Sequence, residues 1–138
     1  MNNENKQHCI QIAETLEAIH NGQMYRCPEC GEYIDEEYYD AETNTCPCCN
    51  SEIESLYDCE QVGLLDYFEN VLDIEYRVGS DRNYRSVRLM VACGGPNIWI
   101  DTKASEVQLV WWNESACCPL DPETCDAIDE CFGELFDC

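Results

Sequence analysis

The sequence predicts an α+β fold: an N-terminal helix, an inserted cysteine-rich module, a second helix, a four-stranded antiparallel meander and a C-terminal helix. Three observations support this order. Apolar residues recur at helical spacing near both ends, cysteines cluster between residues 25 and 53, and the second half carries short β-branched and aromatic segments. We therefore divide the 138 residues into the N-terminal helix (1–23), the cysteine-rich module (24–54) and an α+β domain (55–138).

The N-terminal helix is predicted between Asn5 and His20. Asn21-Gly22 then supplies the residues that usually end a helix. Apolar side chains recur at steps of three and four residues and form one stripe that we expect to be buried: Cys9, Ile12, Ala13, Leu16 and Ile19.

The cysteine-rich module contains an internal repeat. Cys27-Pro28-Glu29-Cys30-Gly31 recurs as Cys46-Pro47-Cys48-Cys49-Asn50. A two-residue spacer lets two thiolates face one ion, and Gly31 or Asn50 tolerates the positive φ of the tight turn that follows. Two such turns complete a tetrahedral site for one structural zinc ion, with four ligands: Cys27, Cys30, Cys46 and Cys49.

Residues 24–54 resemble the zinc-ribbon family, and the four cysteines match its four ligand positions. We call this segment the ribbon. Zinc ribbons often contact nucleic acid or nucleic-acid machinery, but the ligand pattern alone does not transfer a function. Here the loop between the two turns is acidic, the opposite of a phosphate-binding surface. Cys48 occupies the spacer of the second turn, and we expect it not to bind the ion.

A second helix is predicted after the ribbon, with five apolar residues on its inner side: Leu64, Leu65, Phe68, Val71 and Leu72. Between Ile74 and Trp112 the pattern changes to four strand-like segments, IEYRV, YRSVRLMVA, NIWIDT and EVQLVWW. Turn residues separate the four segments, which predicts a meander. In the second segment, alternation places Val87, Leu89 and Val91 on one face of the sheet.

The C-terminal helix is predicted to begin at Pro122, with Asp121 as its N-cap. Its expected buried stripe consists of Ile128, Cys131, Phe132, Leu135 and Phe136. The expected outer face is strongly acidic and consists of Glu123, Asp126, Asp129, Glu130, Glu134 and Asp137.

The net negative charge argues against several functional classes. The chain has 29 acidic and 7 basic residues, a formal net charge of −22, which disfavours direct binding to nucleic acid or to anionic membranes. No stretch is long and apolar enough for a membrane span, and the N-terminus lacks the pattern of a signal peptide. We expect a cytoplasmic protein whose 13 cysteines are metal ligands and free thiols.

The sequence gives little support to an enzyme. The two histidines, His8 and His20, fall in or beside the first helix, where a surface role is the common one. The Cys93-Gly94-Gly95-Pro96-Asn97 segment is expected to be a strand turn. Five further cysteines lack the spacing of a second metal site and are assigned to packing: Cys117, Cys118, Cys125, Cys131 and Cys138.

The uneven distribution of charge suggests a function. Four arginines gather near the first predicted hairpin (Arg77, Arg82, Arg85 and Arg88), and we expect them to pair with neighbouring acids. Rows of carboxylates on a folded chain can imitate the phosphates of a duplex, and interleaved tyrosines add apolar anchors. The expected partner-binding residues are Glu32, Asp35, Glu36, Glu37, Tyr38, Tyr39, Asp40, Glu42, Asp126, Asp129, Glu130 and Glu134.

In size and charge the chain resembles the small acidic phage and mobile-element proteins that inhibit CRISPR nucleases or restriction enzymes. The resemblance implies a partner whose arginine-lined nucleic-acid groove accepts carboxylates, in the cytoplasm of a bacterial host. The alternative is a zinc-ribbon adaptor or regulator that docks on transcription machinery or on another basic protein.

Overall fold

The computed structural model describes residues 3–39, 42, 44–53 and 55–137. Its helices are α1 (Asn3–His20), α2 (Leu64–Tyr67) and α3 (Pro122–Asp137), with short 3-10 turns at Glu36–Tyr38, Leu56–Asp58 and Phe68–Asn70. The strands are β1 (Met24–Arg26), β2 (Tyr33–Asp35), β3 (Glu60–Gln61), β4 (Asp73–Val78), β5 (Tyr84–Ala92), β6 (Asn97–Asp101), β7 (Glu106–Trp111) and β8 (Glu114–Pro119). The α+β class is confirmed.

The strands form two antiparallel sheets. A small sheet has the order β2-β1-β3, and a five-stranded meander has the order β4-β5-β6-β7-β8. The meander was predicted with four strands, and β8 is the strand that the prediction missed. The segment ESACCP is small and polar, with little of the β-branched and aromatic content that marks a strand. It pairs with β7 all the same, with Val107 opposite Cys118 and Leu109 opposite Ala116.

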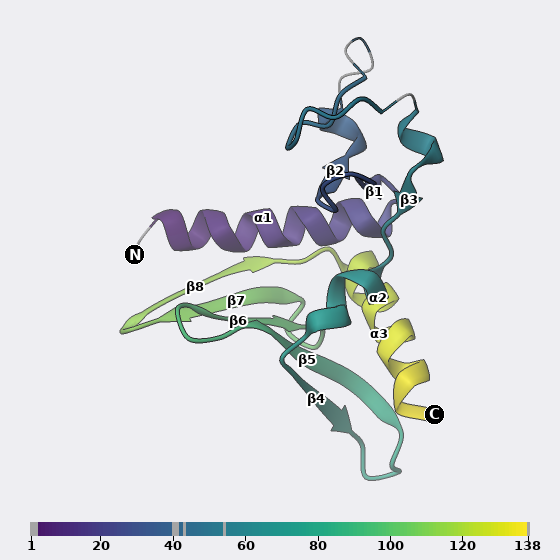
Figure 1. Ribbon diagram of the computed structural model, residues 1–138. Helices are drawn as coiled ribbons and strands as arrows, with labels where there is room; N and C mark the ends of the chain where they lie inside the picture. The colour runs from purple at the N-terminus through teal and green to yellow at the C-terminus, as the bar shows by residue number, and fades with distance from the viewer. Residues whose placement is uncertain (1–2, 40–41, 43, 54, 138) are drawn as a thin grey trace.

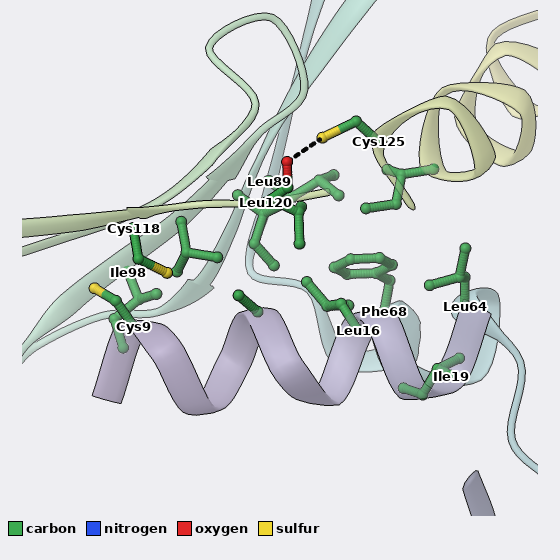
Figure 2. Packing of buried hydrophobic residues seen from close by; sticks show 14 of the residues in the cluster. Cys9, Leu16, Ile19, Leu64, Phe68, Leu89, Ile98, Cys118, Leu120 and Cys125 are labelled. Atoms are coloured by element: carbon green, nitrogen blue, oxygen red, sulfur yellow. Dashed lines mark hydrogen bonds between the residues drawn. The ribbon is translucent and has the colours of Figure 1, made fainter. Parts of the chain in front are cut away.

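Helix α1 lies between the ribbon and the five-stranded sheet (Figure 1). Its predicted stripe is confirmed: Cys9, Ala13, Leu16 and Ile19 are buried, and Ile12 is half-buried. Figure 2 shows Cys9, Leu16 and Ile19 packed among residues of the sheet and of the segments around α2 and α3, including Leu89, Leu120 and Phe68. The first helix is therefore part of the same core as the sheet.

The predicted second helix is much shorter than expected. After the single turn of α2, the chain continues as a 3-10 turn and becomes extended before β4. Leu64 and Phe68 are buried as predicted, and Val71 is half-buried. The predicted burial of Leu65 and Leu72 is wrong, because these side chains are 49% and 58% exposed. One turn of α-helix does not carry the 3.6-residue period far enough to bring all five side chains to one face.

Helix α3 begins where the sequence predicts, and the Thr124 backbone N–H donates to Asp121 Oδ2 at 3.3 Å. Ile128 and Phe132 are buried, while Cys131 and Phe136 are half-buried. The predicted burial of Leu135 is wrong, because its side chain is 45% exposed. The buried face runs instead through Thr124, Cys125, Ile128 and Phe132, so the helix is rotated relative to the expected stripe.

Three of the four arginines near the first hairpin make contacts within the protein. Arg77 makes a bidentate pair with Asp101, with N–O distances of 2.7 and 2.8 Å, and Arg85 pairs with Asp81 at 2.8 Å. The guanidinium of Arg88 instead lies 4.4 Å from the centroid of the Trp99 ring. The expected pairing with acids is thus confirmed for Arg77 and Arg85, whereas Arg88 uses an aromatic ring. Arg82 is exposed and makes no ion pair with the described residues.

Replacing Asp101 is expected to destabilise the sheet. The Asp101 carboxylate is 7% exposed and accepts hydrogen bonds from Arg77 and from the backbone N–H groups of Lys103 and Ala104. Asp101→Asn leaves the half-buried Arg77 guanidinium without a counter-charge and should cost about 2–3 kcal/mol in free energy of unfolding. Asp81→Asn, which breaks an exposed pair, should cost less than about 1 kcal/mol. Urea denaturation of the two variants measures both costs.

The same pair gives a pH dependence. The Arg77 guanidinium, followed by backbone N–H groups, lowers the pKa of Asp101 below its ordinary value of 3.8. A lowered carboxyl pKa stabilises the folded state above 3.8, and this contribution is lost as the pH falls through the lower folded-state pKa. The stability gap between wild type and Asp101→Asn should therefore shrink below pH 3.8; a gap that is constant with pH contradicts the assignment.

Candidate metal centre

The four cysteines of the two repeated turns converge on one point. All four Sγ atoms lie within 4.8 Å of one another. The Cys27–Cys49 and Cys30–Cys46 sulfur pairs are each 3.8 Å apart. For a tetrahedral site with Zn–S bonds of about 2.3 Å, geometry requires neighbouring sulfurs about 3.8 Å apart. The cluster could therefore hold one metal ion, and two of its sulfur pairs already have the spacing of a tetrahedral zinc site.

The two turns that supply the ligands have matching backbone hydrogen bonds. Gly31 N–H donates to the Cys27 carbonyl, and Asn50 N–H donates to the Cys46 carbonyl, each at 2.9 Å. The φ angles of Gly31 and Asn50 are 76° and 60°, which confirms the predicted left-handed conformation at both positions. The sequence repeat is thus a structural repeat, and each half presents two sulfurs to a common centre.

The first cysteine of each turn is buried and the second is exposed. Cys27 and Cys46 pack with a small apolar cluster that also contains Tyr25, Ile34 and Ile53. Cys30 and Cys49 face solvent. Cys48, the expected non-ligand, has an exposed side chain outside the four-sulfur group, while its backbone N–H donates to Cys46 Sγ at 3.3 Å. The chain therefore anchors the centre on one side and leaves the other side at the surface.

The thiols of the centre differ in acidity. Hydrogen bonds with the side chain and backbone of Ser51 lower the pKa of Cys49 to about 6. A backbone hydrogen bond from Glu32 favours the Cys30 thiolate, but desolvation and hydrogen bonds with the other three thiols raise the pKa of Cys30 to about 12. A metal ion that takes all four sulfurs as thiolates must displace protons, so binding weakens as the pH falls.

The acidic residues expected to bind a partner lie on two separate elements. Glu32, Asp35, Glu36, Glu37 and Glu42 belong to the ribbon, whereas Asp126, Asp129, Glu130 and Glu134 lie on α3, on the far side of α1 (Figure 1). Asp40 and the side chain of Tyr38 fall outside the described residues. The structure therefore presents two acidic surfaces rather than one.

Several of these residues also have internal contacts. The half-buried Tyr39 donates its hydroxyl to the Ile53 carbonyl at 2.8 Å, which ties it to the ribbon. Asp129 was expected to face outward, but it is half-buried and accepts a 2.7 Å hydrogen bond from the Tyr84 hydroxyl. Burial, together with this bond, raises the pKa of Tyr84. Tyr39 and Asp129 thus stabilise the fold and offer less to a partner than the exposed acids do.

The sequence prediction missed a groove of about 850 Å³ between α1 and the ribbon. Residues from the polar side of α1, including Gln11, Glu14 and Thr15, meet Asp35 and Glu37 of the ribbon there. The spacing of the α1 residues indicates a polar stripe on the helix, which the sequence alone could have shown. The position of the ribbon over this stripe is visible only in the folded structure.

Cys9, Cys118 and Cys125 are buried in the core, as expected for packing, and Cys131 is half-buried. The expected packing of Cys117 is wrong, because this residue is exposed, and Cys138 lies outside the described residues. Comparisons of the chain with protein-family models, with curated proteins and with solved structures found no match. Among the described residues, no helix has the length and apolar character needed to cross a membrane.

Proposed function

We propose that this protein is a cytoplasmic inhibitor that binds a nucleic-acid-binding effector, either a CRISPR nuclease or a restriction enzyme, by imitating the charge of nucleic acid. The observation that carries the proposal is a net charge of −22 on a folded scaffold. Three of its four hairpin arginines are already engaged, since Arg77 and Arg85 pair with acids and Arg88 lies over Trp99. The acids of the ribbon and α3 are therefore left to act on a basic partner.

The ion that we assign to the four-cysteine centre is zinc. Four thiolates in a tetrahedron are the usual ligand set of structural zinc, and they leave no open position for substrate. Cys27, Cys30, Cys46 and Cys49 would hold the ion, whose role is to fix the ribbon and the acids that it carries. The proposal thus gives the protein a binding role and no reaction.

The test is a panel of CRISPR and restriction nucleases, assayed with and without the protein for DNA cleavage and for DNA binding before cleavage. A charge mimic should block DNA binding, and the block should weaken with salt, because the Debye length falls from about 8 Å at 0.15 M to about 3 Å at 1 M. Excess nucleic acid should displace the protein from its partner. If no nuclease in the panel is inhibited, the proposal fails.

A second candidate is an adaptor that docks on transcription machinery or on another basic protein. The observation that favours it is the tip of the β7–β8 hairpin, where Trp112 is 82% exposed and packs edge-on against Trp111. Exposed tryptophans commonly anchor protein interfaces, and charge mimicry gives these two no role. An adaptor need not be displaced from its partner by nucleic acid, which separates the two candidates.

A further inference from the structure

The groove between α1 and the ribbon has walls from two parts of the chain. Glu14 and Glu17 come from α1, Tyr33, Asp35 and Glu37 come from the ribbon, and Met24 comes from β1. Met24 and Asp35 are direct cross-strand neighbours in the small sheet. In Figure 1 the ribbon lies over the C-terminal half of α1, which places these two walls opposite each other. The groove is thus a consequence of how the ribbon is mounted on the helix.

The lining is negative and has no internal counter-charge. It contains four carboxylates, and none of the described residues that line it is a Lys, Arg or His. Two of the carboxylates accept backbone hydrogen bonds, Asp35 from Glu37 N–H and Glu17 from Asp121 N–H. Glu14 and Glu37 are exposed. A cationic occupant would therefore gain charge–charge attraction without first breaking an ion pair.

The groove also offers apolar surface beside the carboxylates. Ala18, Met24, Tyr33 and Pro47 contribute to its lining. Arginine and lysine bury their aliphatic stems against such surfaces while the charged ends meet carboxylates. The guanidinium of Arg26, which lies outside the lining, is 5.7 Å from the centroid of the Tyr33 ring, so this ring already interacts with a cation.

We propose that this groove binds an arginine- or lysine-bearing segment of the protein partner, an inference that rests on the proposed function and locates its contact. A metal ion is a poorer occupant, because the lining carboxylates do not form a cluster with metal-ligand spacing among the described residues. Nucleic acid is repelled by the same charge. The volume of about 850 Å³ is sufficient for several side chains of an extended segment.

The experiment titrates ¹⁵N-labelled, metal-loaded protein with a peptide of alternating arginine and leucine at physiological salt. Amide shifts should concentrate at Thr15, Ala18, Met24 and Tyr33, which line the groove. The double variant Glu14→Gln/Glu37→Gln should weaken the affinity about tenfold. Both side chains are exposed, so the variant should retain the wild-type spectrum away from the groove.

The matched control is Asp126→Asn/Glu130→Gln, which removes the same charge from the exposed face of α3. This control should change the affinity less than twofold. Equal weakening by the two variants, or shifts spread over α3, would overturn the groove assignment.

The nuclease assay distinguishes a failure of the groove assignment from a failure of the proposed inhibitor function. Inhibition that survives Glu14→Gln/Glu37→Gln leaves the function standing and overturns the groove as its contact site. Peptide binding confined to the groove, with no nuclease inhibited by wild-type protein, supports the groove and contradicts the inhibitor role.

Discussion

Removal of the metal is expected to unfold the ribbon while the five-stranded sheet stays folded. The buried cluster of the ribbon is small, and two of its members, Cys27 and Cys46, belong to the four-cysteine group that could hold the ion. This small number of buried apolar side chains does not offset the conformational entropy that the ribbon loses on folding. We therefore expect metal binding to supply the remaining free energy. Structural zinc supplies about 10–16 kcal/mol in comparable peptides. The sheet has a larger core of its own, built with α1 and α3.

The measurement begins with the metal content, for which we expect one zinc ion per chain. Hydrogen exchange before and after chelation should show that Ile34 and Ile53 lose protection, while Leu89 and Ile100 keep it. Cys46→Ser should reproduce the chelated state. Cys48→Ser is the matched control and should retain the ion, because Cys48 lies outside the four-sulfur group. Protection of Ile34 that persists without metal would show that the ribbon does not need the ion.

Chelation should also remove one wall of the groove, since Asp35 and Glu37 are held by the ribbon. The two surfaces on which the proposed function rests would then respond differently to metal. The acids of α3 stay in place on the sheet core, whereas those of the ribbon lose their fixed positions. We therefore expect metal dependence for binding through the ribbon surface and not for binding through α3.

The convergence of the four cysteines was predictable because its determinants are local in the sequence. The Cys-x-x-Cys spacing fixes which sulfurs share a turn, and Gly31 and Asn50 mark the positive φ after each turn. Strand β8 was harder to predict, because Ser115 and Cys117 face outward and the buried Ala116 and Cys118 are small. Pairing with β7 stabilises this strand, and that contribution is not visible in the segment itself.

The groove and the rotation of α3 depend on tertiary packing, which the local pattern does not encode. The sequence of α1 shows a polar stripe, but nothing in it indicates that the ribbon folds back over that stripe. In α3, both Phe132 and Leu135 fit an apolar stripe, and only contact with Phe68 and the sheet decides which face turns inward. Periodicity identifies a helix and leaves its exact rotation open.

Truncation of Phe132 should be the most destabilising single change in α3, and it tests that rotation directly. The ring is 2% exposed, and its centroid lies 5.6 Å from that of Phe68 in an edge-to-face arrangement. Phe132→Ala should cost about 3–5 kcal/mol, from lost burial and from the cavity left between α3 and the 3-10 turn that carries Phe68. Leu135→Ala is the matched control, and at 45% exposure it should cost less than about 1 kcal/mol.

Urea denaturation followed by tryptophan fluorescence measures these changes in unfolding free energy for the five-stranded sheet and the helices packed on it. Trp99 and Trp111 lie on sheet strands and Trp112 lies in the turn after β7, so the signal follows the sheet core and not the ribbon. A large loss of unfolding free energy for Phe132→Ala, with a small loss for Leu135→Ala, would support the rotation of α3 seen in the structure. Equal losses would mean that Leu135 also packs inward, as the apolar periodicity alone predicts. In that case α3 would be rotated, and the hydrogen bond from Tyr84 to Asp129 would not form as described.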